Sequence, residues 1–405
     1  MLDDFRSAVA AGADRPFLIY FDTTLTYGEV DRLSDAFAVA LADNGFSRGD
    51  RLALYLQNVP QYVLALIATW KLGGIAVAIN PMLTPIEVAK LLVDSSPTVL
   101  ITLDELATPA LVEVMHLSSV QRVITTSAAA WRSGDADDLR VLIEEYDGRM
   151  LAHVDVSDDD VAVITYTSGT TGLPKGAMNT HRNVATGGHA YRDWFALDEH
   201  DVVLGVAPLF HVTGLTGHIA CTVAAGASLV LSYRFNTDVT IDLLRRHRPT
   251  FTVGAITVFI ALGESPNVCA DDLASLTKVA SGGAPIAPAT TDRFQQRFGI
   301  YIHNVYGMTE TTSPVLAVPV GDVAPVDPDT QALSVGVPML TARVTVLGDD
   351  GKPLPPGELG ELAVAGPQVV PGYWRNDAAT RAATRDGWLL TGDVGYADAN
   401  GWHYL

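Results

Sequence analysis

The residues most suited to chemistry gather between Tyr166 and Gly176, where the sequence reads YTSGTTGLPKG. This segment holds three glycines, four Ser or Thr hydroxyls and one of the five lysines in the chain. Glycines let backbone N–H groups close around phosphate oxygens, hydroxyls add further donors, and a lysine adds a compact positive charge. The segment follows an apolar run that predicts a strand. It therefore predicts a phosphate-binding loop composed of Thr167, Ser168, Gly169, Thr170, Thr171, Gly172 and Lys175.

The position of the lysine distinguishes this loop from a Walker P-loop. In a Walker loop, four residues separate the first glycine from Gly-Lys-Ser/Thr. Here Lys175 follows Pro174 and precedes Gly176, so an ordinary P-loop NTPase is excluded. A simple polar surface turn would not need this length or this order of residues.

Four further segments place polar groups beside glycines or a proline. They are PLFHVTGL (208–215), SGGAP (281–285), NVYGMTE (304–310) and TGD (391–393). Tyr306 offers a flat face to a base, and Gly307 lets a ligand approach the backbone. Thr309 can donate to a phosphate, and Glu310 can bind Mg²⁺ through oxygen. Asp393 offers two acceptor oxygens, which suit a pair of ribose hydroxyls.

Together with the glycine-rich loop, these motifs resemble the signatures of the adenylate-forming superfamily, in the same order along the chain. That superfamily comprises acyl-CoA synthetases, nonribosomal peptide adenylation domains and beetle luciferases. The resemblance covers nearly the whole chain and implies that the loop residues bind ATP or AMP. The further nucleotide contacts that it implies are Gly283, Ala284, Pro285, Asn304, Tyr306, Gly307, Met308, Thr309 and Asp393.

The resemblance also implies individual roles. It places Asn304 at the amino edge of adenine, Thr309 at the α-phosphate and Glu310 at the metal. It gives catalytic roles to Thr309, Glu310 and His211, the last beside the acyl pocket and the thiol channel. His218 has no motif support and is expected in the core. The acyl-pocket residues that the resemblance implies are His211, Gly214, Gly254, Gly282 and Gly307.

The activity that the resemblance implies is that of an acid–CoA ligase, with ATP, Mg²⁺ and CoA as cofactors and a carboxylic acid as substrate. The acid would attack the α-phosphorus of MgATP, pyrophosphate would leave, and the CoA thiol would then attack the acyl-AMP. Such chemistry needs positioning and charge stabilisation rather than a covalent nucleophile. The sequence has neither a Gly-x-Ser-x-Gly elbow nor a pair of His at zinc spacing. Two alternatives stay open: an enzyme that loads the phosphopantetheine of a carrier protein, and a catalytically idle protein that binds nucleotide or acyl-adenylate.

The segment 208–215 predicts the class of acid. Amino-acid-activating members of the superfamily commonly carry an Asp there, which pairs with the α-amino group. This chain has Phe210 and His211 and no acidic residue in the segment, and the nearest upstream Asp is Asp201. A buried ammonium without a carboxylate partner is costly. We therefore expect a non-amino acid with an apolar acyl or aryl tail, as in fatty acid or aromatic acid metabolism.

Short β-rich runs alternate with helical patterns through most of the chain, which predicts parallel sheets joined by right-handed crossovers. Thr26–Glu29 and Thr84–Glu87 have the capping-box spacing that starts a helix. The resemblance implies an α/β fold with two doubly wound α/β subdomains and a small distorted antiparallel β-barrel. The expected bounds are about 1–180 and 181–334 for the α/β subdomains and about 335–405 for the barrel.

A long stretch, 202–233, contains no Asp, Glu, Lys or Arg. Because Pro, Gly and His interrupt it, we expect a buried strand–loop–helix–strand rather than a transmembrane segment. The helix is expected at Gly214–Ala224. Further along, a strand is expected at Tyr301–His303.

Members of the superfamily continue, after a strand like the one that ends this sequence, into a small mobile C-terminal domain. That lid carries a lysine that meets the substrate carboxylate and the α-phosphate. The resemblance therefore predicts that residues 1–405 are the large N-terminal adenylation domain without the lid. Such a fragment is expected to fold and to adenylate only weakly.

The composition excludes several classes of partner. The 26 basic and 46 acidic residues give a formal net charge of −20, which disfavours binding to nucleic acid or to an anionic membrane surface. Cys221 and Cys269 are too few for a disulfide framework or a four-cysteine zinc site, and both are expected to be buried. The first residues lack the basic and apolar regions of a signal peptide. A cytoplasmic location is therefore expected.

Overall fold

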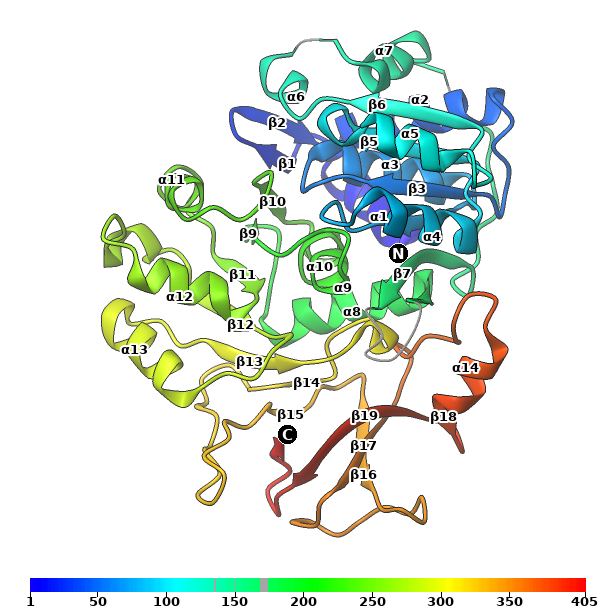
Figure 1. Cartoon of the computed structure of the whole chain (residues 1–405). Helices are drawn as coiled ribbons and strands as arrows, with labels where there is room; N and C mark the ends of the chain where they lie inside the picture. Colours follow the sequence, from blue (N-terminus) through cyan, green and yellow to red (C-terminus); the bar gives the residue numbers. More distant parts are fainter. Residues whose placement is uncertain (135, 150, 168–173) are drawn as a thin grey trace.

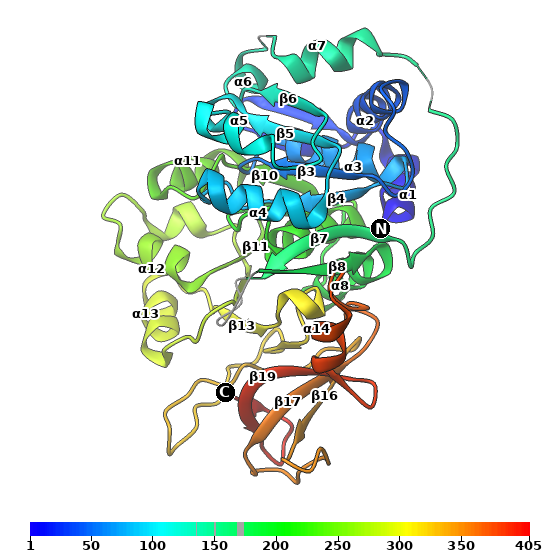
Figure 2. The ribbon, with the colours of Figure 1, turned by 45° about the vertical axis from the view of Figure 1, so that its right-hand side comes forward.

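Three β-sheets organise the part of the protein that the structure describes (Figure 1). The computed structural model describes residues 1–134, 136–149, 151–167 and 174–405. Figures 1 and 2 show the N-terminal sheet uppermost, a second sheet with its helices across the middle, and the C-terminal strands below. Within the described residues, no helix is both long and apolar enough to cross a membrane.

The first sheet has six strands in the order β6-β5-β3-β4-β7-β8. All neighbours pair in parallel except β7 and β8, which form an antiparallel hairpin. The elements up to this hairpin are α1 (Leu2–Gly12), β1 (Pro16–Tyr20), β2 (Thr23–Thr26), α2 (Tyr27–Asp43), β3 (Arg51–Tyr55), α3 (Pro60–Lys71), β4 (Ile75–Ala78), α4 (Pro85–Ser95), β5 (Val99–Leu103), η1 (Asp104–Leu106), α5 (Pro109–Met115), β6 (Arg122–Thr126), α6 (Ala130–Ser133), α7 (Asp138–Glu145), β7 (Val161–Thr167) and β8 (Lys175–Thr180).

Helices cover both faces of this sheet, which explains why its central strands are continuous apolar runs. Along β3, Leu52 and Leu54 pack into the core formed with α2 and α3, whereas Ala53 and Tyr55 pack into the core formed with α4. Both predicted capping boxes are confirmed. The backbone N–H groups of Thr26 and Thr84 donate to the carboxylates of Glu29 and Glu87 at 2.7 and 2.8 Å, where α2 and α4 begin.

The second sheet has nine strands in the order β15-β14-β13-β12-β11-β9-β10-β1-β2. Its strands β13 to β1 pair in parallel, which leaves their carboxyl ends along one edge. The further elements of this part are α8 (His181–Trp194), β9 (Val202–Gly205), α9 (Val212–Gly214), η2 (Leu215–Ala220), α10 (Cys221–Ala225), β10 (Ser228–Leu231), α11 (Thr237–His247), β11 (Phe251–Gly254), α12 (Ile256–Glu264), η3 (Ala270–Leu273), β12 (Lys278–Ser281), α13 (Pro288–Phe298), β13 (His303–Tyr306), η4 (Thr309–Thr311), β14 (Leu316–Ala317) and β15 (Val337–Pro338).

Two expected elements differ from the structure in this part. The single helix expected at Gly214–Ala224 is a continuous helical segment, α9–η2–α10, whose middle is a π-helical turn. The strand expected at Tyr301–His303 lies two residues further along, as β13, because Asn304 pairs with Ser281 of β12. The motif residues Asn304 to Tyr306 therefore lie on a strand of the sheet rather than after it. The uncharged stretch 202–233 forms β9, the helical segment and β10, and is not a membrane helix.

The C-terminal sheet is antiparallel and runs β16-β17-β19-β18, with β20 paired to β19. Its elements are β16 (Arg343–Leu347), β17 (Gly360–Ala365), α14 (Asp377–Ala382), β18 (Thr384–Arg385), β19 (Trp388–Ala397) and β20 (His403–Tyr404). The expected α/β fold class, with parallel sheets and a small antiparallel sheet, is confirmed.

The strand pairing departs from the expected division of the chain at two places. β15 (Val337–Pro338) pairs with β14 in the nine-stranded sheet, although the barrel is expected from about residue 335. The second departure lies near the N-terminus. β1 pairs in parallel with β10, and β2 pairs with β1 at the edge of the nine-stranded sheet. Residues 16–26 therefore belong with the second sheet, although they lie within the first 180 residues. This return connection also buries Phe17, which stacks on Tyr27 at a ring distance of 4.4 Å.

Candidate active site

The predicted phosphate-binding loop joins the two strands of the β7–β8 hairpin. Ser168, Gly169, Thr170, Thr171 and Gly172 lie outside the described residues. Thr167 and Lys175 are described, and they pair across the hairpin as the last residue of β7 and the first residue of β8. Lys175 is thus the start of a strand rather than a residue within the loop. Its ammonium lies 5.2 Å from the ring centre of Tyr373.

The predicted acyl-pocket glycines follow neighbouring parallel strands. Gly254 ends β11, and Gly282 and Gly307 follow β12 and β13 at the same edge of the sheet. The N–H of Gly282 donates to the carbonyl of Gly254 at 3.3 Å. A Cβ on Gly282 would lie 2.5 Å from the carbonyl oxygen of Val305, so only glycine fits there. Ligands of open α/β sheets bind at this carboxyl edge.

A cleft of about 350 Å³ opens at the same edge. The predicted nucleotide-binding residues that line it are Gly283, Ala284, Pro285, Asn304, Tyr306, Gly307 and Asp393. Leu333 and Val335 add an apolar wall that no sequence motif marked. An apolar wall needs only shape and burial, so residues of this kind carry no recognisable spacing.

The polar groups of this cleft are held in defined orientations. The side-chain N–H of Asn304 donates to the carbonyl of Ser334 at 3.1 Å, which leaves the side-chain carbonyl oxygen of Asn304 to accept an amino group. The hydroxyl of Tyr306 donates to Oδ2 of Asp393 at 2.6 Å. Burial and the bond to this carboxylate raise the pKa of the Tyr306 phenol, so it remains a donor.

The predicted phosphate and metal residues Thr309 and Glu310 begin the short turn η4, which lies beside β8. The side chain of Asn179, on β8, donates to the carbonyl of Thr309 at 3.3 Å and to the hydroxyl of Thr312 at 2.9 Å. The N–H of Met308 donates to the hydroxyl of Thr311 at 3.0 Å, so this predicted nucleotide contact uses its own N–H inside the turn. Hydrogen bonds therefore connect η4 directly to the β7–β8 hairpin, which carries the predicted phosphate loop.

Glu310 is the predicted metal ligand. Its carboxylate is buried and accepts a hydrogen bond from the hydroxyl of Tyr373 at 2.7 Å. Burial raises the pKa of the Tyr373 phenol, and the hydrogen bond to Glu310 raises it further by a smaller amount. Among the described residues, no group of three or more His, Cys, Asp or Glu side chains could hold a metal ion. One carboxylate beside the hairpin that carries the predicted phosphate loop suits Mg²⁺, because that ion usually takes its remaining ligands from substrate phosphates and water.

His211 and Gly214 begin the helical segment that follows β9. The side chain of His211 caps α9, because its Nδ1 accepts from the N–H of Thr213 at 3.3 Å. The residue as a whole is exposed, but neighbouring protein atoms partly remove water from the imidazole, and this desolvation lowers its pKa. Gly214 packs on the backbone of Pro208, where a Cβ would lie 2.1 Å from the carbonyl oxygen. Both residues lie beyond the carboxyl end of β9, beside β11 in the sheet.

His218 is a core residue, as expected. Its Nε2 accepts from the N–H of Ala207 at 3.0 Å, and its Nδ1 lies 3.0 Å from the carbonyl of Gly217. Burial lowers its pKa to about 4, so the ring is neutral and fixes the loop that leaves β9. The cysteine expectation was half right: Cys221 is buried, whereas Cys269 is exposed because it precedes η3 on the surface.

Asp201 lies at the opposite end of β9 from the cleft. Its carboxylate accepts from Lys278 at 2.9 Å and from the hydroxyl of Thr250 at 2.6 Å. These bonds engage the Asp201 carboxylate in a structural ion pair at the amino edge of the sheet.

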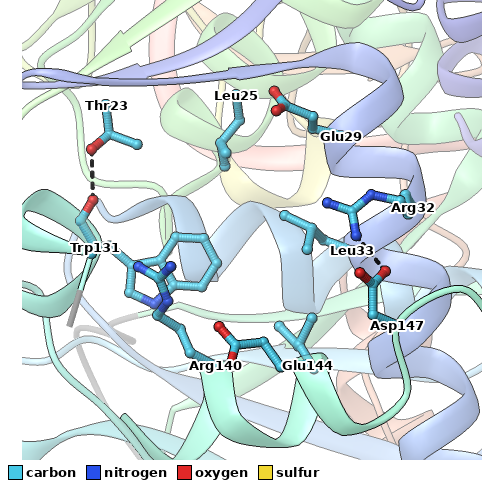
Figure 3. A pocket seen from close by; sticks show the side chains of 11 residues that line it. Thr23, Leu25, Glu29, Arg32, Leu33, Trp131, Arg140, Glu144 and Asp147 are labelled. Atoms are coloured by element: carbon cyan, nitrogen blue, oxygen red, sulfur yellow. Dashed lines mark hydrogen bonds and ion pairs between the residues drawn. The ribbon is translucent and has the colours of Figure 1, made fainter. Parts of the chain in front are cut away.

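A second cleft, of about 390 Å³, lies between α2 and the α6–α7 segment (Figure 3). Three of the charged side chains that line it have partners within the protein. Arg32 pairs with Asp147, and the guanidinium of Arg140 lies 5.3 Å from the ring centre of Trp131. None of the predicted site residues that the structure describes lines this cleft. The candidate site is therefore the 350 Å³ cleft at the carboxyl edge of the nine-stranded sheet.

Known proteins match this fold and these motifs. The AMP-binding enzyme family matches residues 5–374. The long-chain-fatty-acid–CoA ligase of Bacillus subtilis (strain 168) is 31% identical, over 97% of this chain and 73% of its own length. The 4-coumarate–CoA ligase 5 of Oryza sativa subsp. japonica is 34% identical, over 93% and 69%. The solved structure of a long-chain-fatty-acid-CoA ligase from Archaeoglobus fulgidus superposes with a TM-score of 0.88 at 25% identity, over 100% of this chain and 83% of that one. On this similarity along nearly its whole length, the chain belongs to the AMP-binding enzyme family of adenylate-forming acid–CoA ligases.

Proposed function

We propose that this protein activates a carboxylic acid with ATP to form acyl-AMP, and then transfers the acyl group to the thiol of CoA. The observation that carries the proposal is the convergence of seven nucleotide-binding candidates on one cleft at the carboxyl edge of the nine-stranded sheet. Relatives that are named CoA ligases support it.

The cleft suits adenosine in its shape and polarity. The ring of Tyr306 and the apolar wall formed by Leu333 and Val335 would enclose the base. The carbonyl oxygen of Asn304 would accept from the adenine amino group. Asp393 would accept from both ribose hydroxyls, and its bond to Tyr306 keeps the carboxylate at the cleft.

The phosphates would extend from the cleft toward η4 and the β7–β8 hairpin. Thr309 would donate to the α-phosphate, residues 168–172 would donate further hydrogen bonds, and the Lys175 ammonium would offset the phosphate charge. Glu310 would hold Mg²⁺, which supplies charge neutralisation on the phosphate oxygens. These groups together offset the charge that develops as the acid attacks the α-phosphorus and pyrophosphate leaves.

We propose a non-amino carboxylic acid with an apolar acyl or aryl tail as the substrate. The segment 208–215 contains no acid, and Asp201 is paired with Lys278 at the opposite edge of the sheet. A buried α-ammonium would therefore lack a partner. His211 at the rim, with Gly254 and Gly282, would border the acyl group. The acids for which two relatives are named, a long-chain fatty acid and 4-coumarate, fit this class.

We further propose free CoA as the acceptor and the cytoplasm as the location. The named relatives are CoA ligases rather than carrier-loading enzymes. Two free cysteines, one of them exposed, suit a reducing compartment.

The test is acid-dependent ATP–pyrophosphate exchange across short, medium and long fatty acids, aromatic acids and α-amino acids. Exchange with a simple acid, followed by thioester formation with CoA, is expected. Asp393→Asn should reduce exchange, whereas Asp350→Asn, a change in an exposed turn outside the cleft, should not. A panel in which an α-amino acid supports the fastest exchange would overturn the substrate class. A carrier protein that outcompetes CoA would overturn the acceptor.

A further inference from the structure

We propose that Tyr373 is a positioning residue for the metal and phosphate end of the site. Its hydroxyl orients the Glu310 carboxylate, and its ring positions the Lys175 ammonium through a cation–π contact. The inference rests on the proposed function, and it adds a residue that lies outside every motif found in the sequence.

The contact between Tyr373 and Glu310 is buried. The hydroxyl lies 2.7 Å from Oε1 of Glu310, and the two residues are 7% and 6% exposed. A buried carboxylate is stable only where hydrogen bonds or charges compensate for the lost water. Since this bond uses Oε1, it fixes the rotation of the carboxylate and leaves Oε2 to face a cation.

The backbone around Tyr373 holds the hydroxyl in place. The segment 370–374 is hydrogen-bonded through its backbone to both β8 and η4. The N–H of Val370 donates to the carbonyl of Glu310 at 2.9 Å. On the other side, the carbonyl of Gly372 accepts from Met178 at 3.0 Å, and the N–H of Trp374 donates to Gly176 at 2.7 Å. The segment 370–374 therefore fixes the distance between the β7–β8 hairpin and Glu310, the proposed metal ligand.

The ring of Tyr373 contacts the positive group of the same site. The ammonium of Lys175 lies 5.2 Å from the ring centre, within the range of a cation–π contact. One side chain thus touches both a positive and a negative group proposed to act on the phosphates. A tyrosine used only for packing would need neither its hydroxyl bond nor this ring contact.

Two variants separate the functions of hydroxyl and ring. Tyr373→Phe removes the hydroxyl and keeps the ring, whereas Tyr373→Leu removes both. ATP binding is measured by calorimetric titration, once with Mg²⁺ and once with EDTA. We expect Tyr373→Phe to weaken MgATP binding about tenfold and to leave metal-free ATP binding unchanged. We expect Tyr373→Leu to weaken metal-free ATP binding as well, by roughly two- to fivefold.

Tyr233→Phe is the matched control. It removes a hydroxyl bond to a carboxylate, that of Glu105, and neither residue lines the nucleotide cleft. It should change neither affinity. Equal MgATP affinity in the wild type and Tyr373→Phe would overturn the inference, and so would an equal loss with and without Mg²⁺. A wild-type protein that binds no ATP in either condition would instead contradict the proposed function, and with it the inference. If Tyr373→Leu does not fold, the Phe variant alone decides.

Discussion

The hydroxyl of Tyr306 donates to Oδ2 of Asp393 at 2.6 Å, although the two residues lie 87 positions apart in the chain. Tyr306 ends β13 in the nine-stranded sheet, and Asp393 lies on β19 in the C-terminal sheet. The bond therefore joins two sheets at the candidate cleft, which both residues line. A ribose bound in the cleft would meet the Asp393 carboxylate in an orientation that the bond to Tyr306 already fixes.

Asp393→Asn tests this ribose contact. We expect the affinity for AMP to fall about tenfold, because a charge-assisted hydrogen bond becomes a neutral one. The affinity for 2′,3′-dideoxy-AMP should change little, since that analogue lacks both hydroxyls. Calorimetry with the two nucleotides measures both effects. The same loss for AMP and for the dideoxy analogue would show that Asp393 does not bind the ribose.

Thr170→Ala and Thr171→Ala test the predicted phosphate loop. Each should weaken MgATP binding by roughly 10- to 150-fold, since one hydrogen bond to a charged group contributes about 1.5–3 kcal/mol. Adenosine has no phosphate, so its affinity should be unchanged in both variants. Unaltered MgATP affinity in both variants would remove the loop from the site.

Gly282→Ala tests the close packing of β12 on β13. The new Cβ would lie 2.5 Å from the carbonyl oxygen of Val305, so β13 must shift. We expect the free energy of unfolding to fall by about 1–3 kcal/mol, as measured by urea denaturation. Gly263→Ala is the control, because it lies in α12 with its nearest neighbour 3.6 Å away. That change should be neutral or stabilise the protein by up to about 1 kcal/mol. Similar unfolding midpoints for the two variants would contradict the packing described here.

His181 predicts a pH dependence of stability. Its side chain is buried against Trp70, and within the described residues neither ring nitrogen has a hydrogen-bond partner. Burial lowers its pKa from 6.5 to about 3. Between these values the unfolded chain binds a proton that the folded protein does not, so stability is lost as the pH falls below about 6.5.

The variant His181→Phe isolates this effect. Between about pH 7.5 and about pH 5.5, the wild type should lose about 1 kcal/mol more of its unfolding free energy than the variant does. Other titrating groups, His218 among them, are present in both proteins and cancel in the comparison. Urea denaturation at both pH values provides the measurement, and an identical pH dependence would refute the assignment.

Local features of this fold could be predicted from the sequence, because their causes lie within a few residues. The capping boxes at Thr26 and Thr84 start helices through bonds that span three positions. Asn304, Tyr306, Gly307 and Asp393 could be selected from their motifs by residue type, and all four line one cleft.

Features that depend on distant contacts could not be predicted in the same way. The pairing of β1 with β10 joins residues about two hundred positions apart, and no local pattern records such a partner. Leu333 and Val335 are ordinary apolar residues until the fold places them against the cleft. Tyr373 likewise has no special spacing, and its importance follows only from the buried contact with Glu310.

Which bond of ATP breaks decides whether this protein adenylates a carboxylic acid. The protein is incubated with MgATP, CoA and an acid whose carboxylate carries ¹⁸O, and the released nucleotide is analysed by mass spectrometry. If the carboxylate attacks the α-phosphorus and CoA then displaces AMP, the AMP must carry one oxygen from the acid. Unlabelled AMP, or ADP with a labelled phosphate, would contradict the adenylation of the acid by this protein.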